Sequence, residues 1–472
     1  MNAHPGLPEA RHKTCDLLII GAGPAGMAAA ILAAESGLSV IVADEGSGPG
    51  GQIYRHCLDQ NAHMASVLGR DYQKGRALAT RFAAAQAEHL SQTTVFMLEP
   101  QPEGGVLAGL SHAADGTAQL CRARHVLIAT GALERPFPIA GWTLPGVMTA
   151  GAGQTLMKAG GLVPEGPLVL AGSGPLLMLL AAQYLRAGVS IAAILETTPL
   201  ANFSGALRSL PGFLFSRYAL KGAVLLGEVL RKAKVFWGVT GLSALGETRL
   251  ETVAFRHRGQ ERRIPARQLL LHQGVVPQVN LAMSAGVAHR WSEQRLAFEP
   301  ILSAEFATNV EGIFIAGDTG GIGGADAAEA SGTLAALAIA RRHGKAQPHH
   351  LAAEACARSG LSSALRGRDF LDRLYRPAEH FRKPADDVII CRCEEVTAGQ
   401  IRALARRGVQ GPNQAKAFSR AGMGPCQARQ CGLSVCELMA EVQGCSPGEA
   451  GHMRIRAPVK PVTVAQMAQL GD

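Results

Sequence analysis

The chain has 472 residues, of which 47% are hydrophobic and 18% charged, and its formal net charge is +9. This length exceeds what one hydrophobic core serves, so two or three domains are expected, and the composition excludes extended disorder. The positive charge is not gathered in a run, so nothing indicates nucleic-acid recognition. Ten cysteines in a chain expected to be cytoplasmic indicate metal or redox chemistry, not a disulfide framework.

A strand, a glycine turn and a helix form the first strong pattern, between Thr14 and Glu45. The apolar run ending at Ile20 predicts the strand, and a G-x-G-x-x-G turn then opens an alanine-rich helix. Gly21 permits the tight turn, Gly23 lets the backbone approach a pyrophosphate, and Gly26 lets the helix pack closely on the sheet. The pyrophosphate belongs at the helix N-terminus, and an acid at the end of the second strand binds the ribose. The predicted contacts are Gly21, Gly23, Pro24, Ala25, Gly26, Asp44 and Glu45.

Two later segments are predicted to contact the same cofactor through their backbone. Residues 48–55, GPGGQIYR, break secondary structure after the second strand, and they either cross the cofactor or form an ordinary turn. A buried strand then ends in A-T-G, and three prolines follow, which places a turn at the carboxyl end of a parallel strand. The predicted contacts are Gly51, Gln52, Ile53, Thr130 and Gly131. This A-T-G segment resembles that of the flavoprotein disulfide reductase superfamily, which implies two dinucleotide-binding domains in an α/β fold.

A second nucleotide-like unit spans residues 167–196 and contains Gly172 and Gly174, but its third motif position is Leu177. A leucine there is expected to push helix and strand apart or to alter the turn. The superfamily binds NAD(P)H in this inserted domain. The departure at Leu177, and the absence of arginine just after Glu196, argue against NAD(P)H, so its efficient use is expected to be lost while the fold is retained.

The chain returns to the first domain at residues 310–332, where a strand delivers Gly317 and Asp318 to a glycine-rich turn before a long helix. From the residues alone, Asp318 could be only a helix cap. The resemblance implies that the G-D pair holds the ribityl and phosphate part of FAD. No C-x-x-C occurs in the sequence, so thiol–disulfide exchange is not the expected activity.

Four cysteines near the C-terminus form two pairs, Cys391 with Cys393 and Cys426 with Cys431. In an extended run, two cysteines separated by one residue point to the same side and can reach one iron. Four thiolates are what a [2Fe–2S] cluster needs, and backbone amides of the glycines near Cys426 can hydrogen-bond to it. Structural zinc fits poorly, because its cysteine pairs usually have two to four intervening residues. Cys436 is the reserve ligand.

The pattern C-x-C…C-x(4)-C after G-M-G-P resembles the bacterioferritin-associated ferredoxin (BFD) type of [2Fe–2S] domain, which is small and α-rich. The whole chain, including MRIRAPVKPVT, residues 453–463, resembles the α (A) subunits of heteromeric opine oxidases and dehydrogenases, such as octopine and nopaline oxidases. Hydroxyproline dehydrogenase α subunits and hydrogen cyanide synthases are related.

This resemblance implies electron transfer from a β subunit, which has its own FAD in a D-amino-acid-oxidase-like fold and oxidises an opine or hydroxyproline. The acceptor would be a quinone or cytochrome, through which the cytoplasmic protein could be peripheral at the inner membrane. The presence of a small γ subunit, or of an FMN at an interface between subunits, stays open. So do three alternatives, a hydrogen cyanide synthase subunit, a stand-alone NADH-dependent reductase and an iron-release partner of a ferritin-like cage. No residue is named as a catalytic base by its spacing.

The expected organisation follows from these motifs: a flexible tail (1–12), a first FAD-binding part (13–150), an inserted NAD(P)-binding-like domain (151–290), a second FAD-binding part (291–345), a helical connector (346–385), a BFD-like [2Fe–2S] domain (386–445) and a C-terminal tail (446–472). Within the first part, residues 72–90 have helical periodicity and residues 93–123 predict a β-meander.

Overall fold

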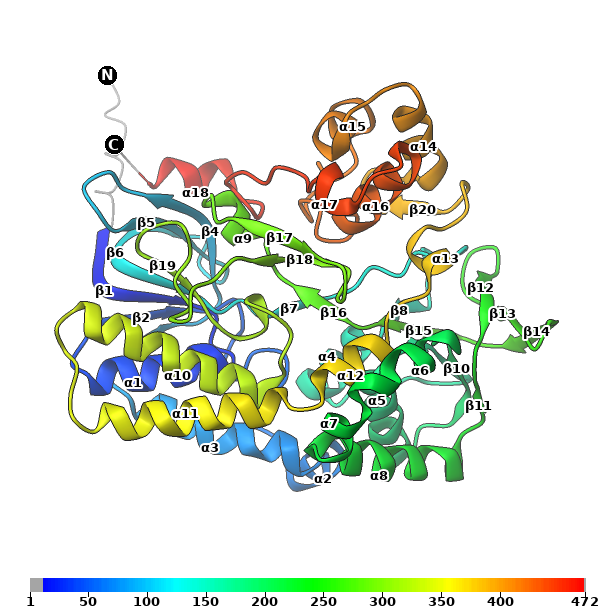
Figure 1. Cartoon of the computed structure of the whole chain (residues 1–472), viewed down its shortest axis with the longest axis horizontal. Coiled ribbons are helices and arrows are strands. Elements are labelled where there is room, and N and C mark those ends of the chain that lie inside the picture. Colours follow the sequence, from blue (N-terminus) through cyan, green and yellow to red (C-terminus); the bar gives the residue numbers. More distant parts are fainter. Residues whose placement is uncertain (1–11, 471–472) are drawn as a thin grey trace, which may run out of the picture.

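The computed structural model describes residues 12–470, so most of the expected N-terminal tail lies outside the described residues. Two sheets covered by helices stand side by side, and a small helical domain rests above the junction between them (Figure 1). The α/β fold with two nucleotide-binding-like domains and an α-rich C-terminal domain is therefore confirmed.

The first sheet has seven strands in the order β3-β2-β1-β6-β5-β4, with β19 also pairing with β6. Strand β6 pairs parallel with β1 along one edge. Along its other edge, its first half pairs antiparallel with β5 and its last three residues pair parallel with β19. The strands are β1 (His12–Ile20), β2 (Val40–Ala43), β3 (Glu88–Leu90), β4 (Thr93–Pro100), β5 (Val106–His112), β6 (Ala118–Ile128) and β19 (Ile313–Ile315).

Helix α1 (Pro24–Glu35) is buried on nearly all sides, between this sheet and helix α10 (Ala325–Arg342). Gly332 makes the close approach of α10 possible, because a Cβ atom there would lie 2.1 Å from the carbonyl oxygen of Ala25. The other helices beneath this sheet are α2 (Ala62–Leu68), α3 (Arg70–Ala84) and α11 (His350–Leu365).

The second sheet is fully parallel and runs β11-β10-β9-β15-β8. An antiparallel meander of β12 (Thr240–Leu245), β13 (Thr252–His257) and β14 (Gln260–Pro265) is attached to it. The strands of the main sheet are β8 (Val147–Thr149), β9 (Leu168–Ser173), β10 (Ile191–Glu196), β11 (Val235–Phe236) and β15 (Gln268–Gln273). Its helices are α4 (Ala150–Gly160), α5 (Pro175–Arg186), α6 (Ala201–Ala206), α7 (Leu210–Leu214) and α8 (Arg217–Lys232).

Two short strands join the halves, because β7 (Ala132–Glu134) pairs antiparallel with β16 (Val275–Pro277). Helix α9 (Asn280–Ser284) and the hairpin of β17 (His289–Ser292) and β18 (Ala297–Pro300) follow β16, and the hairpin extends below the C-terminal domain in Figure 1. This junction therefore touches all three parts of the molecule.

The C-terminal domain starts with a hairpin and packs its helices around α16. The connector before it contains α12 (Arg368–Leu374) and α13 (Glu379–Arg382). The domain consists of β20 (Ile389–Cys391), β21 (Val396–Thr397), α14 (Ala398–Arg406), α15 (Gly411–Ser419), α16 (Gly432–Gln443) and α17 (Pro447–Ala450). Residues 459–470, expected to be part of a C-terminal tail, pack on the first sheet: the N–H of Val459 donates to the carbonyl oxygen of Phe96 at 2.9 Å. Nε2 of Gln466, on α18 (Val464–Ala468), donates to Ser111 Oγ at 2.7 Å.

Two local expectations are wrong. The helix expected over residues 72–90 ends at Ala84, because residues 88–90 form β3 on the edge of β2. Cys391 and Cys393 do not share an extended run, because the chain turns over residues 392–395 between β20 and β21. Strand β8 also joins the second sheet slightly before residue 151, where the inserted domain is expected to begin.

Candidate functional site

The first glycine turn has the geometry that its residues predict. Gly21 has φ +105°, and a Cβ there would lie 2.6 Å from the carbonyl oxygen of Ala129. A Cβ at Gly26 would lie 1.8 Å from the carbonyl oxygen of Gly21, so only glycine allows α1 to pack this closely. Gly23 caps α1 without any side-chain hydrogen bond. The N–H groups of the first turn of the helix therefore face an anion site.

The loop of residues 48–55 packs across the glycine turn. The N–H of Gly50 donates to the carbonyl oxygen of Ala22 at 2.8 Å, and a Cβ at Gly51 would lie 2.9 Å from Gly23 Cα. The backbone next to Gln52 and Ile53 is held by Lys158.

Lys158, on α4, is a residue that the sequence analysis missed. Its Nζ donates to the carbonyl oxygens of Gln52 and Ile53, both at 3.0 Å. Burial, with a smaller contribution from the Arg55 charge, lowers the pKa of Lys158 to about 7. A single lysine in a helix gives no sequence signal for this role.

The two acids at the end of β2 differ in their contacts. Asp44 accepts hydrogen bonds from the N–H groups of Ala22 (2.6 Å) and Gly46 (2.7 Å), so its carboxylate lies directly at the glycine turn. Glu45 is exposed and forms an ion pair with Lys460 near the C-terminus. The geometry distinguishes Asp44 as the acid of the nucleotide turn.

The A-T-G and G-D segments meet at the carboxyl ends of β6 and β19. The buried Thr319 hydroxyl accepts the N–H of Gly131 at 2.7 Å and lies 3.3 Å from the Thr130 hydroxyl. Asp318 Oδ1 accepts N–H groups from the two residues before α10, at 2.9 and 3.0 Å. A Cβ at Gly317, where φ is +70°, would lie 2.9 Å from Ala25 Cβ. Thr319, missed earlier, directly follows the G-D pair, which is the signal that could have found it.

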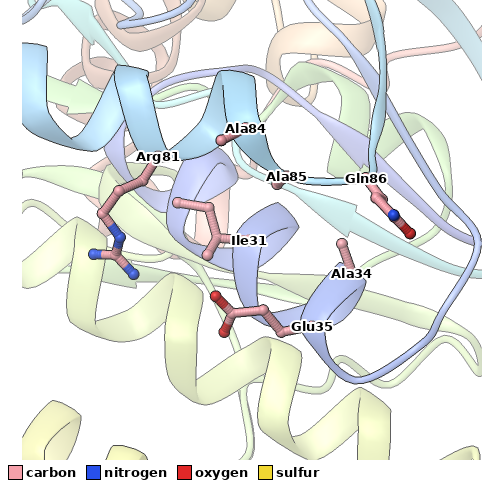
Figure 2. Close-up of a pocket in the computed structure, with 7 residues that line it drawn as sticks. All are labelled: Ile31, Ala34, Glu35, Arg81, Ala84, Ala85 and Gln86. Atoms are coloured by element: carbon pink, nitrogen blue, oxygen red, sulfur yellow. The ribbon is translucent and has the colours of Figure 1, made fainter.

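These segments bring the predicted residues of the first domain together around one end of α1. A glycine cradle, an uncapped helix N-terminus and a carboxylate at the second strand fit the pyrophosphate and ribose of a dinucleotide. Figure 2 shows a different feature, a hollow of about 430 Å³ lined by alanines, Glu35 and Arg81. It lies at the far end of α1, roughly 18 Å along a helix of this length from the glycine turn, so it is not the dinucleotide site.

The four C-terminal cysteines lie together in two pairs that differ from the pairs in sequence. The Cys431 thiol donates to Cys391, and this hydrogen bond, with backbone N–H groups that include that of Gly422, lowers the pKa of Cys391 to about 6. The Cys393 and Cys426 side chains also lie against each other, and burial, with a smaller contribution from Cys393, raises the pKa of Cys426. Cys391 and Cys431 are buried, whereas Cys393 is exposed and Cys426 partly exposed.

Gly424 lies directly against this group of thiols. A Cβ at Gly424 would lie 2.3 Å from the Cys393 Cβ and 3.1 Å from its Sγ. Among residues 12–470, no three His, Cys, Asp or Glu side chains are arranged around one metal ion. The thiols form two pairs instead, and two pairs of ligands are what a binuclear iron–sulfur cluster takes.

The other cysteines lie apart from this group. Cys436 is buried and its thiol donates to the carbonyl oxygen of Pro447 at 3.1 Å, so it is poorly placed as a reserve ligand. Cys15 and Cys121 are buried with their sulfurs 3.9 Å apart. Cys356 is exposed.

The turn of the second nucleotide fold is altered at its second glycine. Gly174 has φ +110°, whereas Gly23 has φ −76°, and Leu177 is fully buried. At the end of β10, burial raises the pKa of Glu196 to about 7, and the Thr198 hydroxyl donates to its carboxyl group. Tyr375 of the connector lies near this carboxyl group, and burial, helped by the Glu196 charge, raises the pKa of Tyr375 to about 12.

Comparison with known proteins fits this architecture. The family model "pyridine nucleotide-disulphide oxidoreductase" matches residues 15–332, and the model "sarcosine oxidase A3 domain" matches residues 388–470. The chain is 44% identical to the A subunit of opine oxidase from Agrobacterium tumefaciens, over 96% of its own length and 92% of the relative's length. It belongs to the opine oxidase A-subunit family.

The chain is also similar to other oxidoreductases. The HcnB subunit of hydrogen cyanide synthase from Pseudomonas aeruginosa is 33% identical over 96% of this chain and 98% of that protein. The crystal structure of L-proline dehydrogenase from P. horikoshii shares the fold at a TM-score of 0.72 and 18% identity, covering 97% of this chain and 80% of that one. Members of this family are flavin-type oxidoreductases, so the sequence-based assignment of family and enzyme class is confirmed.

The matched sarcosine oxidase A3 domain includes residues 446–470 together with the cysteine segments, which agrees with their packing in the structure. None of the helices within residues 12–470 combines the length and apolarity needed to cross a bilayer.

Proposed function

We propose that this chain is the FAD- and [2Fe–2S]-carrying electron-transfer subunit of a heteromeric enzyme that oxidises an opine, or alternatively hydroxyproline. The observation that carries the proposal is the group of four thiols, joined to a flavin-type fold that has no C-x-x-C beside its glycine turn. A flavin exchanges two electrons and an iron–sulfur cluster exchanges one, so together they suit a relay to a quinone or cytochrome.

The residues proposed to hold FAD are those around the first glycine turn. The N-terminus of α1 and Gly23 would receive the pyrophosphate, Asp44 the ribose, and Asp318 with its glycine turn the ribityl and phosphate part. Lys158 and Thr319 would fix the loop and the A-T-G segment that complete the site. Cys391, Cys393, Cys426 and Cys431 would hold the cluster.

The names of the relatives as subunits support a partner β subunit that carries out substrate oxidation. The exposed apolar side chains on and around α6–α8 support a contact surface for that partner, since patches of this kind mark interaction sites. Exposed basic side chains, Arg208 between α6 and α7 and Arg231 and Lys232 on α8, suit an acidic rim on the partner. The apolar residues of this surface are Leu200, Phe203, Leu207, Leu214, Phe215, Leu220 and Val224.

Co-purification of the chain with its β subunit tests this surface. Phe215→Glu should weaken the complex, because it places a charge in the centre of the apolar surface. Leu351→Glu, an equally exposed leucine on α11, is the matched control and should leave the complex intact. Equal loss with both variants, or with neither, would contradict the assignment.

The isolated chain tests the function itself. It should contain flavin and iron but oxidise opines and hydroxyproline only slowly, and strong turnover without a partner would overturn the proposal. Cys426→Ser should remove or destabilise the cluster while FAD stays bound, since the two groups of residues lie in different domains. Stoichiometric zinc in place of iron would contradict the cluster assignment.

Three other functions would give different results. Rapid bleaching of the flavin by NADH would favour a stand-alone reductase, and iron-dependent binding to a ferritin-like cage without redox turnover would favour an iron-release partner. Release of cyanide by the complex with its partner would favour a hydrogen cyanide synthase subunit.

A further inference from the structure

The two cysteine segments are each held by one side chain from outside the C-terminal domain. Nδ2 of Asn280, on α9, donates to the carbonyl oxygen of Gln427 at 2.6 Å, and Gln427 directly follows Cys426. Nε1 of Trp142, in the loop after β7, donates to the carbonyl oxygen of Ile389 at 2.7 Å, two residues before Cys391. Both Asn280 and Trp142 are buried.

The Asn280 contact lies where the loop needs support. Gln427 and Ala428 have φ values of +47° and +64°, a left-handed conformation that residues other than glycine seldom adopt in succession. Within the loop, Gln427 Nε2 donates to the Gly424 carbonyl oxygen at 3.1 Å and Arg429 Nη1 to the Cys426 carbonyl oxygen at 3.2 Å. Asn280 adds the bond that ties this strained turn to the flavin-type part of the chain.

The Trp142 contact has two components. Besides the hydrogen bond from its indole nitrogen, its ring receives the Arg392 guanidinium at 5.3 Å from the ring centroid. Arg392 stands between Cys391 and Cys393 in the hairpin turn, so the indole fixes both the strand and the turn that carry these two thiols.

The same short segment reaches the residues proposed to hold the flavin. The N–H of Gln278 donates to the carbonyl oxygen of Gly131 at 3.1 Å, and Gly131 is bonded to Thr319. Asn280 follows Gln278 by two residues. One turn of chain therefore touches the A-T-G segment at one end and the Cys426 loop at the other.

We propose that Asn280 and Trp142 are positioning residues for the cluster: Asn280 fixes the Cys426–Cys431 loop, Trp142 fixes the Cys391–Cys393 hairpin, and together they set the cluster's place relative to the flavin. This inference rests on the proposed function, since it takes the four thiols as the cluster ligands. Partners outside the ligand set typically change metal affinity by about 10–100-fold when they are removed.

The test uses the full-length chain with iron content, flavin content and the electron paramagnetic resonance spectrum of the dithionite-reduced protein as readouts. Asn280→Asp keeps the shape of the side chain but removes the donor, and Trp142→Phe keeps an aromatic ring but removes the indole N–H. Both variants should keep flavin, release iron to a chelator on the order of tenfold faster and show shifted g values.

Two variants serve as controls. Trp291→Phe removes an indole N–H that has no partner among the described residues, and Asn202→Ala removes an amide that donates to the connector at Leu374. Neither should alter iron release or the spectrum. If wild-type protein holds no iron, the proposed function fails. If wild-type protein holds a cluster and both test variants match it in iron release and spectrum, the positioning role alone is overturned.

Discussion

The two nucleotide folds of this chain share a strand, a turn and a helix but differ at the second and third positions of the glycine motif. In the first fold the third position is Gly26, and its helix contacts the backbone of Gly21 so closely that a methyl group would not fit. In the second fold it is Leu177, which is fully buried in the core. A shared strand, turn and helix therefore preserve the architecture, whereas the third residue decides how near the helix comes to the turn.

The strand ends of the two folds differ as well. Asp44, after the second strand of the first fold, accepts N–H groups at the glycine turn. Glu196, at the corresponding place in the second fold, is buried beside Thr198 and the connector residue Tyr375. The Asp44 carboxylate thus lies at the glycine turn of the first fold. The Glu196 carboxyl group is instead buried by neighbouring residues of the chain.

Gly26→Ala should produce the largest effect. The added methyl group would lie 1.8 Å from the Gly21 carbonyl oxygen, so α1 must move away from the sheet at a cost of about 3 kcal/mol or more. The purified variant should lose its flavin absorbance. Gly205→Ala, where a Cβ meets nothing within 4 Å, is the control and should keep it.

Leu177→Ala tests the corresponding position of the second fold. Removing a fully buried leucine side chain typically costs about 2–5 kcal/mol, so the midpoint of denaturant unfolding should fall. Flavin and iron should both remain bound in the folded variant. Loss of flavin at this position would show that the two folds are not separable.

Glu196→Gln should change how stability depends on pH. The pKa of Glu196 is raised from 4.5 to about 7 in the folded protein, so between these values the folded form holds a proton that the unfolded form has released. Its contribution is therefore fully present below about pH 4.5 and is lost as the pH rises to about 7, by up to roughly 3 kcal/mol. Denaturant unfolding at several pH values should show this slope in wild type and a smaller one in Glu196→Gln. The exposed Glu247→Gln should leave it unchanged.

The smallest expected effects are on flavin binding, and they should differ between the two acids at the end of β2. Asp44→Ala leaves two N–H groups at the turn without their acceptor and should weaken flavin binding by about 1–3 kcal/mol. Glu45→Gln breaks only an exposed ion pair with Lys460, typically worth about 0–1 kcal/mol. Titration of the apoprotein of each variant with FAD measures its affinity for the flavin. Equal weakening would mean that both acids bind the cofactor.

The sequence was most informative where one residue type has one physical use. Gly21 and Gly26 could be assigned their roles because no side chain fits at either place, and the G-D segment was placed at the strand end where it lies. The grouping of the four cysteines was likewise predictable from their paired spacing.

What could not be predicted depends on contacts between distant segments. The turn of residues 392–395, which contains Cys393, includes Glu395 at φ +52°, and no glycine in this segment signals that left-handed conformation. Residues 88–90 form a strand because β2 offers them a parallel edge, and local periodicity does not contain that information. Lys158, Trp142 and Asn280 act through backbone carbonyl groups of other segments, so their own neighbours in sequence give no sign of the role.

The packing of Gly332 against Ala25 has a consequence for the way this protein is made. Helix α1 leaves the ribosome early, but its final cover, α10, is separated from it by the whole second fold. At typical synthesis rates of about 5–20 residues per second, α1 waits roughly 15–60 s for that cover. During this time an almost wholly apolar helix is open to chaperones and to other nascent chains. A site that needs both the first glycine turn and the Gly317–Asp318 segment can accordingly be completed only after residue 318 has been made.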